Sequence, residues 1–331
     1  MKFTDRSLLV IGDLILDEYL HGDSTRISQE APVPIVRFRE FEYRLGGAGN
    51  VAANIATLGG SARVIGLLGN DKGSSIFGRL LSSYGVSFVY AGSRRMTIKT
   101  RIIANGQQIG RVDTEDVNPV EGDDLKAIVA HIRGTVSESC AVVISDYAKG
   151  VITPDVMDTI RSCADSAGIP VFLDPKVSQA EIYRKTESRY PIEVITPNYH
   201  EAEGLAGSMY TNLYDMSTSI SFKYAAKNVL ITRGEDGMTL VSHVPNAPMR
   251  SVDIPTAAHE VFDVSGAGDT VIATLALACA SGYTIEQAAR MANIAAGVAV
   301  GKRGTATVSY DELVAAGGSD ICIDGTNPVG V

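Results

Sequence analysis

The sequence predicts an α/β fold in which a central, mostly parallel sheet is flanked by helices and a small β-sheet lid projects from it. Three observations support this prediction. Short apolar runs alternate with helical segments from residue 121 onward, the pattern of a parallel sheet covered by helices. An apolar run near the N-terminus ends in a glycine and Asp13, as a buried strand would. The dipeptide Asn105-Gly106 separates two β-rich runs, which is a strong hairpin signal.

The lid is expected to form from two separate parts of the chain. Residues 27–43 should be an exposed ribbon, because Pro32 and Pro34 suit the edge of a sheet rather than its centre. The runs 96–104 and 107–112 should pair as the hairpin. The other elements expected in this part of the chain are a strand over 7–12, a helix over 46–60, a strand over 62–68 and a helix over 74–84.

The remaining elements are expected to complete one domain. That domain should cover residues 1–316, with lid segments near 24–44 and 96–113, and a loose glycine-rich tail over 317–331. The strands expected after the lid cover residues 141–145, 170–174, 192–196, 228–232 and 238–242. The helices expected there cover residues 123–133, 154–167, 198–206, 267–281 and 285–301.

The composition limits which binding partners and which cellular compartment we expect for this protein. The net charge is −9 and the isoelectric point is about 5.1, so nucleic acid is not an expected partner. Asp13 and Asp17 interrupt the N-terminal apolar run, which argues against a signal peptide. The most apolar helical run, 271–280, is too short to cross a bilayer. The four cysteines form no CxxC pair and fit a reducing compartment, so we expect a cytoplasmic protein without a membrane partner.

The strongest chemical signal lies in residues 263–270, which read DVSGAGDT directly before an expected helix. Small residues let the backbone approach a ligand, and the free N–H groups of a helix start attract an anion. Asp269 within such an anion site could accept a proton from a hydroxyl that attacks phosphorus. The alternative is a glycine-rich helix start that is simply capped by an aspartate.

Five motifs together resemble the ribokinase family, also called the carbohydrate kinase family, over about residues 8–308. They are DVSGAGD at 263–269, GGAGNVA at 46–52, Asn198-Tyr199-His200-Glu201, Thr232-Arg233-Gly234 and NIAAG at 293–297. The resemblance implies a ribokinase-like fold and an enzyme that uses ATP and Mg²⁺ to phosphorylate a carbohydrate.

The resemblance also implies roles for individual residues. Asp269 would be the catalytic base, and the N–H groups of Gly266, Ala267 and Gly268 would stabilise the transferred phosphoryl group. Asn198 and Glu201 would hold Mg²⁺ through water, although the same pair could be only a capping box. The implied nucleotide-binding residues are Lys176, Asn198, Glu201, Thr232, Gly234, Gly237 and Asn293. The implied sugar-binding residues are Asp13, Asp17, Gly46, Gly47, Asn50 and Asp146, with Asp17 the weaker of the first two.

Four segments resemble heptose 7-phosphate kinases more narrowly: RISQEAPVPIV at 26–36, SDYAKG at 145–150, DPK at 174–176 and GDTVI at 268–272. Such kinases phosphorylate the 1-hydroxyl of D-glycero-β-D-manno-heptose 7-phosphate to the 1,7-bisphosphate, in ADP-heptose synthesis for the lipopolysaccharide core. The chain resembles their stand-alone form and carries no H-x-G-H nucleotidyltransferase motif. Departures at Val177, Tyr199-His200 and Arg233 affect nucleotide preference more than sugar identity.

A phosphorylated sugar requires local cations, and the lid hairpin supplies three. Lys99 and Arg101 alternate along one strand and Arg111 lies on its partner, although such a basic edge can also serve only to deter aggregation. So small a sheet cannot bury an apolar face alone, and in related kinases two lids clasp each other, so we expect a homodimer. The competing functions are another ribokinase-family sugar or nucleoside kinase, of the ribose or fructose type, and a catalytically inactive ligand-binding protein.

Overall fold

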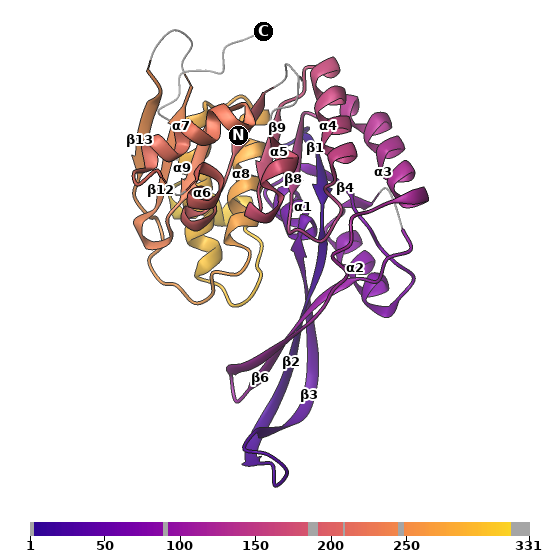
Figure 1. The fold of residues 1–331 in the computed structure, drawn as a ribbon. Helices are drawn as coiled ribbons and strands as arrows, with labels where there is room; N and C mark the ends of the chain where they lie inside the picture. The colour runs from indigo at the N-terminus through magenta and orange to yellow at the C-terminus, as the bar shows by residue number, and fades with distance from the viewer. Residues whose placement is uncertain (1–2, 89–91, 185–190, 208, 244–247, 319–331) are drawn as a thin grey trace.

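The structure, a computed structural model, describes residues 3–88, 92–184, 191–207, 209–243 and 248–318. It contains a nine-stranded sheet in the order β13-β12-β11-β10-β9-β8-β1-β4-β5 and a separate four-stranded sheet in the order β3-β2-β6-β7 (Figure 1). The predicted α/β class and the separate small sheet are confirmed.

The large sheet is parallel from β4 to β11. Its strands are β1 (Ser7–Gly12), β4 (Ser61–Ile65), β5 (Ser87–Phe88), β8 (Ala141–Ser145), β9 (Val171–Asp174), β10 (Ile192–Ile195), β11 (Ala226–Thr232), β12 (Met238–Ser242) and β13 (Arg250–Ile254). β12 and β13 are antiparallel. Because parallel strands end at the same edge, the residues that follow β1, β8, β9 and β11 come together there.

Helices cover both faces of this sheet. Along β1, Leu8 and Val10 belong to one buried cluster, while Leu9 and Ile11 belong to the other, because successive strand residues point to opposite faces. The first face carries α1 (Ala48–Thr57), α2 (Lys72–Ser83), α8 (Ala267–Ala280), α9 (Ile285–Val300) and α10 (Tyr310–Leu313). The second face carries α3 (Gly122–Thr135), α4 (Pro154–Ala167), α5 (Ala180–Tyr183), α6 (Tyr199–Ala206) and α7 (Leu213–Tyr224). Within the described ranges, no helix combines the length and apolarity needed to span a bilayer.

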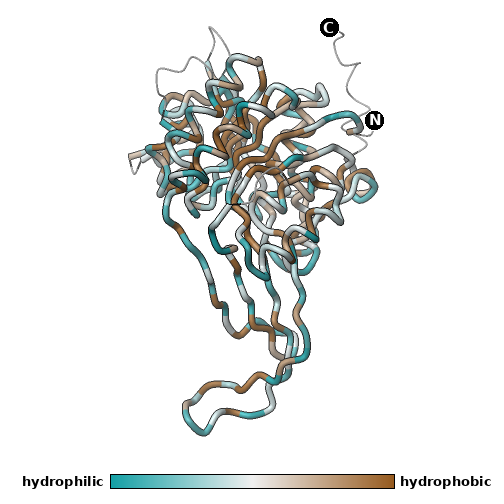
Figure 2. Tube along the Cα trace, turned by 90° about the vertical axis from the view of Figure 1, so that its right-hand side faces the viewer, coloured by the Kyte–Doolittle hydropathy of each residue, from teal (hydrophilic) through white to brown (hydrophobic). Residues whose placement is uncertain are grey.

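The small sheet projects from the body and is the expected lid (Figure 1). It consists of β2 (Leu14–Ile27), β3 (Pro34–Gly47), β6 (Thr97–Ala104) and β7 (Gln107–Thr114). Asn105 and Gly106 both have positive φ angles, 51° and 82°, as the predicted two-residue hairpin turn requires. Figure 2 shows hydrophobic residues concentrated in the body, whereas hydrophobic and hydrophilic residues mix along the lid.

The structure differs from the sequence prediction in several elements. β2 enters the lid at Leu14, directly after Asp13, whereas the lid was expected to begin near residue 24. The sequence also did not predict α5, α7, α10, β5 and β13. The strands 7–12 and 141–145 and the helix 154–167 have the predicted bounds. The predicted tail falls almost wholly on residues 319–331, outside the described ranges.

Candidate active site

Asp269 lies in the first turn of α8 and is only 2% exposed. Its Oδ2 accepts a hydrogen bond from Asn50 Nδ2 at 2.9 Å, and its Oδ1 accepts one from the Tyr147 hydroxyl at 2.8 Å. Gly266, the residue before α8, has φ 79°, and a Cβ there would lie 2.7 Å from Asn50 Nδ2. Glycine is therefore required both by the backbone angle and by the approach of Asn50.

Burial raises the pKa of Asp269 to about 6, while the hydrogen bonds from Asn50 and Tyr147 lower it and so limit the rise. The carboxylate is therefore ionised at neutral pH but close to its titration range. Such a group is well matched to accept a proton from a hydroxyl.

The start of α8 also provides backbone donors. A helix leaves its first N–H groups without intrahelical partners and concentrates positive potential there. The N–H of Ala267 donates to Val264 O at 3.2 Å, so that donor is partly used within the turn. The N–H of Gly268 is the better-placed donor for an anion because helix geometry gives it no acceptor four residues earlier.

On the lid side, Asp17 lies on β2 and not on a helix or turn. It is 4% exposed, and its two oxygens accept hydrogen bonds from Arg101 Nη1 and Thr305 Oγ1, both at 2.6 Å. A Cβ at Gly46 would lie 2.7 Å from Asp17 Oδ2, and a Cβ at Gly47 would lie 2.4 Å from the Asp13 carbonyl oxygen. The glycine pair therefore lets β3 approach β2 closely beside the site.

Asp13, one of the residues expected to bind sugar hydroxyls, is engaged by backbone N–H groups in this structure. Asp13 is 1% exposed, and its carboxylate accepts hydrogen bonds from the N–H groups of Tyr147 (2.8 Å), Lys149 (2.9 Å) and Val151 (3.1 Å). These three bonds fix the loop after β8. Asp17, by contrast, lies between the lid strands and the loop around Thr305.

Asp146, also expected to bind the sugar, is engaged by protein donors in a similar way. It is 1% exposed, and it accepts hydrogen bonds from the N–H of Ala148 at 2.7 Å and from the Tyr183 hydroxyl. Burial and the charge of Asp13 raise the pKa of Asp146 to about 7. Burial raises the pKa of Asp13 as well, so these two neighbouring carboxyl groups influence each other's protonation.

Asp146→Asn is expected to stabilise the protein at pH 8 by about 2 kcal/mol. Because the pKa is raised in the folded state, protonated Asp146 contributes fully to the free energy of unfolding below the unfolded-state pKa. This contribution is lost as the pH rises through 7. An amide imitates the protonated acid and avoids that loss. Urea unfolding at pH 5 and pH 8 measures the effect, with exposed Asp165→Asn as the control. An Asp146→Asn protein that is less stable than wild type at pH 8 would contradict the raised pKa of Asp146.

The three predicted lid cations differ in their surroundings. Arg101 is paired with Asp17, and Arg111 donates to both oxygens of Asp113 at 2.9 and 3.1 Å. Among the described residues, Lys99 has no hydrogen-bond or ion-pair partner, and its Nζ lies 5.5 Å from the centre of the Tyr147 ring. Lys99 is therefore the cation of this group that is most available to an anion.

The predicted nucleotide-side residues lie at the ends of β9 and β10. Asn198 Oδ1 accepts the Glu201 N–H at 2.9 Å and Glu201 Oε2 accepts the Asn198 N–H at 3.0 Å, so the capping box is present. The other Glu201 oxygen is bonded to Lys176 Nζ. Asp174 is also near Lys176, and burial raises its pKa well above the ordinary value.

A pocket of about 410 Å³ lies beside the start of α8. It brings together Thr232, Gly234, Gly237 and Asn293, which the sequence predicted to surround the nucleotide. The Asn293 side-chain amide donates to Pro255 O at 2.8 Å. The pocket also contains apolar residues that the sequence did not predict: Met238, Val261, Val264, Val271, Ala296 and Val300. Such a wall suits a flat aromatic base.

Comparison with known proteins identifies the family. The profile described as "pfkB family carbohydrate kinase" matches residues 5–312. The chain belongs to this family. Proteins called "Bifunctional protein HldE" from Citrifermentans bemidjiense and Vibrio cholerae are 41% and 40% identical over 320 and 318 residues. Each alignment covers 95% of this chain but 64% of the relative, so the chain spans slightly less than two thirds of their length.

Solved structures of pfkB-like kinases share the fold. Phosphofructokinase-2 from Escherichia coli with substrates and products has a TM-score of 0.77 at 20% identity, covering 94% of this chain and 98% of that one. Ribokinase from Arabidopsis thaliana, complexed with ribose and ATP, has a TM-score of 0.69 at 20% identity with the same coverages. At this identity the likeness concerns the fold alone.

Kinases of this family use ATP with Mg²⁺ in general. The described residues contain no cluster of three or more His, Cys, Asp or Glu side chains arranged to chelate a metal directly. Glu201 and Asp174 supply hard oxygen atoms beside Lys176, which suits a hydrated Mg²⁺ that is carried mainly by phosphates. The residues therefore fit an ion that is bound through water.

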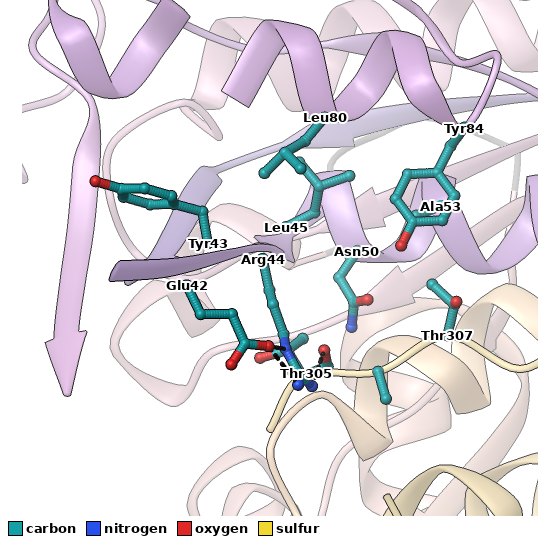
Figure 3. A pocket seen from close by; sticks show the side chains of 11 residues that line it. Glu42, Tyr43, Arg44, Leu45, Asn50, Ala53, Leu80, Tyr84, Thr305 and Thr307 are labelled. Carbon is teal, nitrogen blue, oxygen red and sulfur yellow. Dashed lines mark hydrogen bonds and ion pairs between the residues drawn. The ribbon is translucent and has the colours of Figure 1, made fainter. Parts of the chain in front are cut away.

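A second pocket of about 360 Å³ opens beside Asn50, between the base of the lid of this pfkB-family kinase and the loop 305–307 (Figure 3). Arg44 lies in its wall and donates to Glu42 Oε1 at 2.7 Å, to Thr305 O at 3.1 Å and to Arg303 O. The dashed lines in Figure 3 show Arg44 held by Glu42 and Thr305. Because these acceptors already surround its guanidinium, Arg44 ties the lid to the loop and is a poor candidate for a sugar phosphate.

Proposed function

We propose that this chain transfers the γ-phosphoryl group of ATP to the 1-hydroxyl of D-glycero-β-D-manno-heptose 7-phosphate, giving the 1,7-bisphosphate for ADP-heptose synthesis. The observation that carries the proposal is the position of Asp269, at the start of α8, beside the apolar pocket and in hydrogen-bond contact with Asn50 and Tyr147. About 40% identity to proteins named HldE, and the heptose-kinase-like segments, support this sugar over ribose or fructose.

In the proposed reaction, Asp269 accepts the proton of the sugar hydroxyl as its oxygen attacks the γ-phosphorus. A new O–P bond forms, the bond between the γ-phosphorus and its bridging oxygen breaks, and ADP leaves with the electron pair. The N–H of Gly268, with those of Gly266 and Ala267, and the Lys176 ammonium stabilise the charge on the phosphoryl group. Magnesium, when bound, would neutralise the phosphate oxygens. Glu201 would hold its water shell.

We assign the sugar to the space between the lid and the start of α8. Asp17, Asn50 and the backbone at Gly46 and Gly47 would surround its hydroxyls, and Lys99 would bind the 7-phosphate. The nucleotide base would occupy the pocket that contains Thr232, Gly234, Gly237 and Asn293. We place the protein in the cytoplasm, where both substrates would be available.

The test is phosphoryl transfer followed by ³¹P NMR, with ATP, Mg²⁺ and one sugar in each reaction. The proposal expects heptose 7-phosphate to be consumed and a new phosphate resonance to appear at the anomeric position. Ribose, fructose and unphosphorylated heptose serve as comparison substrates. Faster turnover of ribose or fructose would overturn the heptose assignment, and no turnover of any sugar would favour the inactive ligand-binding alternative.

The lid surface leads us to propose a homodimer formed through two lids. Its exposed apolar side chains include Phe38 and Phe41, which are 52% and 41% exposed with ring centres 4.8 Å apart. Ile27, Val33 and Val112 are also more than half exposed on the same sheet or its connecting turn. Exposed apolar side chains on a projecting sheet are typical of a protein interface.

Sedimentation at micromolar concentration is expected to give a dimer for the wild-type protein and a monomer for the double variant Phe38→Ser, Phe41→Ser. The matched control is Phe222→Ser on α7 of the body, where the phenyl ring is 70% exposed, and this variant should remain dimeric. A wild-type monomer, or an unchanged dimer in the double variant, would contradict the lid interface.

A further inference from the structure

Tyr147 is a site residue that the sequence analysis did not identify. Its hydroxyl donates to Oδ1 of Asp269 at 2.8 Å, while Asn50 holds Oδ2 at 2.9 Å. Each carboxylate oxygen thus has a different donor, on a different element. The two bonds together fix the rotation of the carboxylate, and each oxygen retains a lone pair for a proton from the substrate.

The loop that carries Tyr147 is built to hold it in place. The N–H of Tyr147 donates to buried Asp13, which also accepts the N–H groups of Lys149 and Val151. The next residue, Ala148, has a φ of 54°, a left-handed conformation that costs a non-glycine residue of the order of 1 kcal/mol. A strained residue that is held by a buried carboxylate indicates that the position of the neighbouring Tyr147 is closely determined.

The Tyr147 ring also contacts cations from both substrate sides. Lys99 Nζ, from the lid, lies 5.5 Å from the ring centre, and Lys176 Nζ, from the end of β9, lies 5.4 Å from it. Both distances are within the range of a cation–π interaction. Tyr147 is therefore placed where the proposed sugar site meets the proposed phosphate site.

We propose that Tyr147 is a positioning residue of the phosphoryl transfer: its hydroxyl holds the Asp269 carboxylate in the orientation and ionisation state that proton transfer requires. This inference rests on the proposed role of Asp269 as the base. The competing explanation is that Tyr147 is only a buried tyrosine whose hydroxyl needs an acceptor.

The charged and titratable groups around Asp269 determine how its pKa should change when the Tyr147 hydroxyl is removed. Tyr147 comes from the loop after β8, Asp17 from β2, Lys99 from β6, and Asp174 and Lys176 from the end of β9. Asp17 raises the pKa of Asp269, whereas Lys99 and the Tyr147 hydrogen bond lower it. Removing the hydroxyl alone should therefore raise that pKa and leave the charges in place.

Tyr147→Phe keeps the ring and both lysine contacts and removes only the hydroxyl. We expect kcat to fall about 10- to 100-fold, the effect of losing a hydrogen bond to a charged group. The acid limb of the kcat pH profile should move up by about 1 pH unit, while the KM for ATP should stay within about twofold of wild type. A purely structural tyrosine would not move the acid limb.

The matched control is Tyr224→Phe, which removes a buried tyrosine hydroxyl from the Leu205 carbonyl oxygen on α6, away from the proposed base. It should leave the acid limb where it is. Ala148→Gly is the second variant: it relaxes the loop without removing a contact, and should shift the acid limb in the same direction as Tyr147→Phe, by less. If Tyr147→Phe does not fold, the pH profile of Ala148→Gly tests the positioning role of Tyr147 instead.

The inference is overturned if Tyr147→Phe has the wild-type kcat and pH profile, or if Tyr224→Phe shifts the acid limb equally. Asp269→Asn, measured in parallel, separates this failure from a failure of the proposed function. An inactive Asp269→Asn with an unaffected Tyr147→Phe rejects only the role of Tyr147. An active Asp269→Asn rejects the base itself.

Discussion

Asp269→Asn is expected to lower kcat by about 10²–10⁴-fold, the usual contribution of a general base, while the fold and ATP binding are retained. The amide preserves the shape of the side chain and can still accept the Tyr147 hydrogen bond, but it cannot take a proton from the sugar. The measurement is a coupled assay for ADP release, with nucleotide binding followed by calorimetry.

Thermal unfolding provides the control for this variant. The pKa of Asp269 is raised to about 6, so the protonated group contributes stability that is lost as pH rises through 6. At pH 8 the neutral amide should therefore be no less stable than wild type. Turnover within threefold of wild type, which is about 0.7 kcal/mol of barrier, would remove Asp269 from the mechanism.

Lys99→Ala is expected to reduce kcat/KM for heptose 7-phosphate about 10- to 150-fold, with a much smaller effect on unphosphorylated heptose. Of the three predicted lid cations, Lys99 is the one without a carboxylate partner among the described residues. Burial lowers its pKa, although the charge of Asp17 opposes this effect. A sugar phosphate would supply the missing counter-charge. The measurement is a comparison of both sugars with both enzymes.

Arg111→Ala is the matched control because Arg111 already has Asp113 as its partner and its side chain is 49% exposed. It should affect both sugars little. Equal loss of activity on both sugars in Lys99→Ala would mean that Lys99 serves the fold or Tyr147, and the 7-phosphate must then bind elsewhere. Arg44 is not a good alternative binding residue for the 7-phosphate, since its guanidinium already donates to Glu42 and to two backbone carbonyls.

The body of the fold could be predicted because its strands and helices have strong local signals. β1 and β8 are continuous apolar runs that are buried on both faces, and α4 has a Thr153 cap and Pro154 in its first turn. α7 was missed because LYDMSTSISFKY is rich in serine and threonine, which favour caps and turns over helix interiors. Its buried Met216, Ile220 and Tyr224 recur at helical spacing but are too few to stand out.

β2 was missed for a different reason, and the error affected the site. Leu14–Ile27 carries Asp17, Glu18 and His21, so it lacks the clean apolar pattern of a buried strand. Asp17 is buried there only because Arg101 and Thr305, distant in sequence, provide its partners. Tyr147 likewise gave no periodic signal, since its partner Asp269 is 122 residues away. The motifs, by contrast, located the glycine loop and several of the residues that line the pocket beside α8.

The loop at 303–305 joins parts of the molecule that the two substrates would touch separately. On one side, Arg44 of β3 holds its carbonyl groups, and Thr305 bonds Asp17 at 2.6 Å and Tyr19 at 3.1 Å, both on β2. On the other side, the N–H of Gly304 donates at 3.0 Å to Asp263, in the glycine loop before α8.

A rotation of the lid about its base would therefore have to move this loop or break its hydrogen bonds to the lid strands. The loop begins just after Val300, which lines the pocket proposed for the nucleotide, so a movement at the proposed sugar site would be transmitted toward that pocket. Thermodynamic linkage makes such coupling reciprocal: if bound sugar changes the affinity for nucleotide by some factor, bound nucleotide changes the affinity for sugar by the same factor.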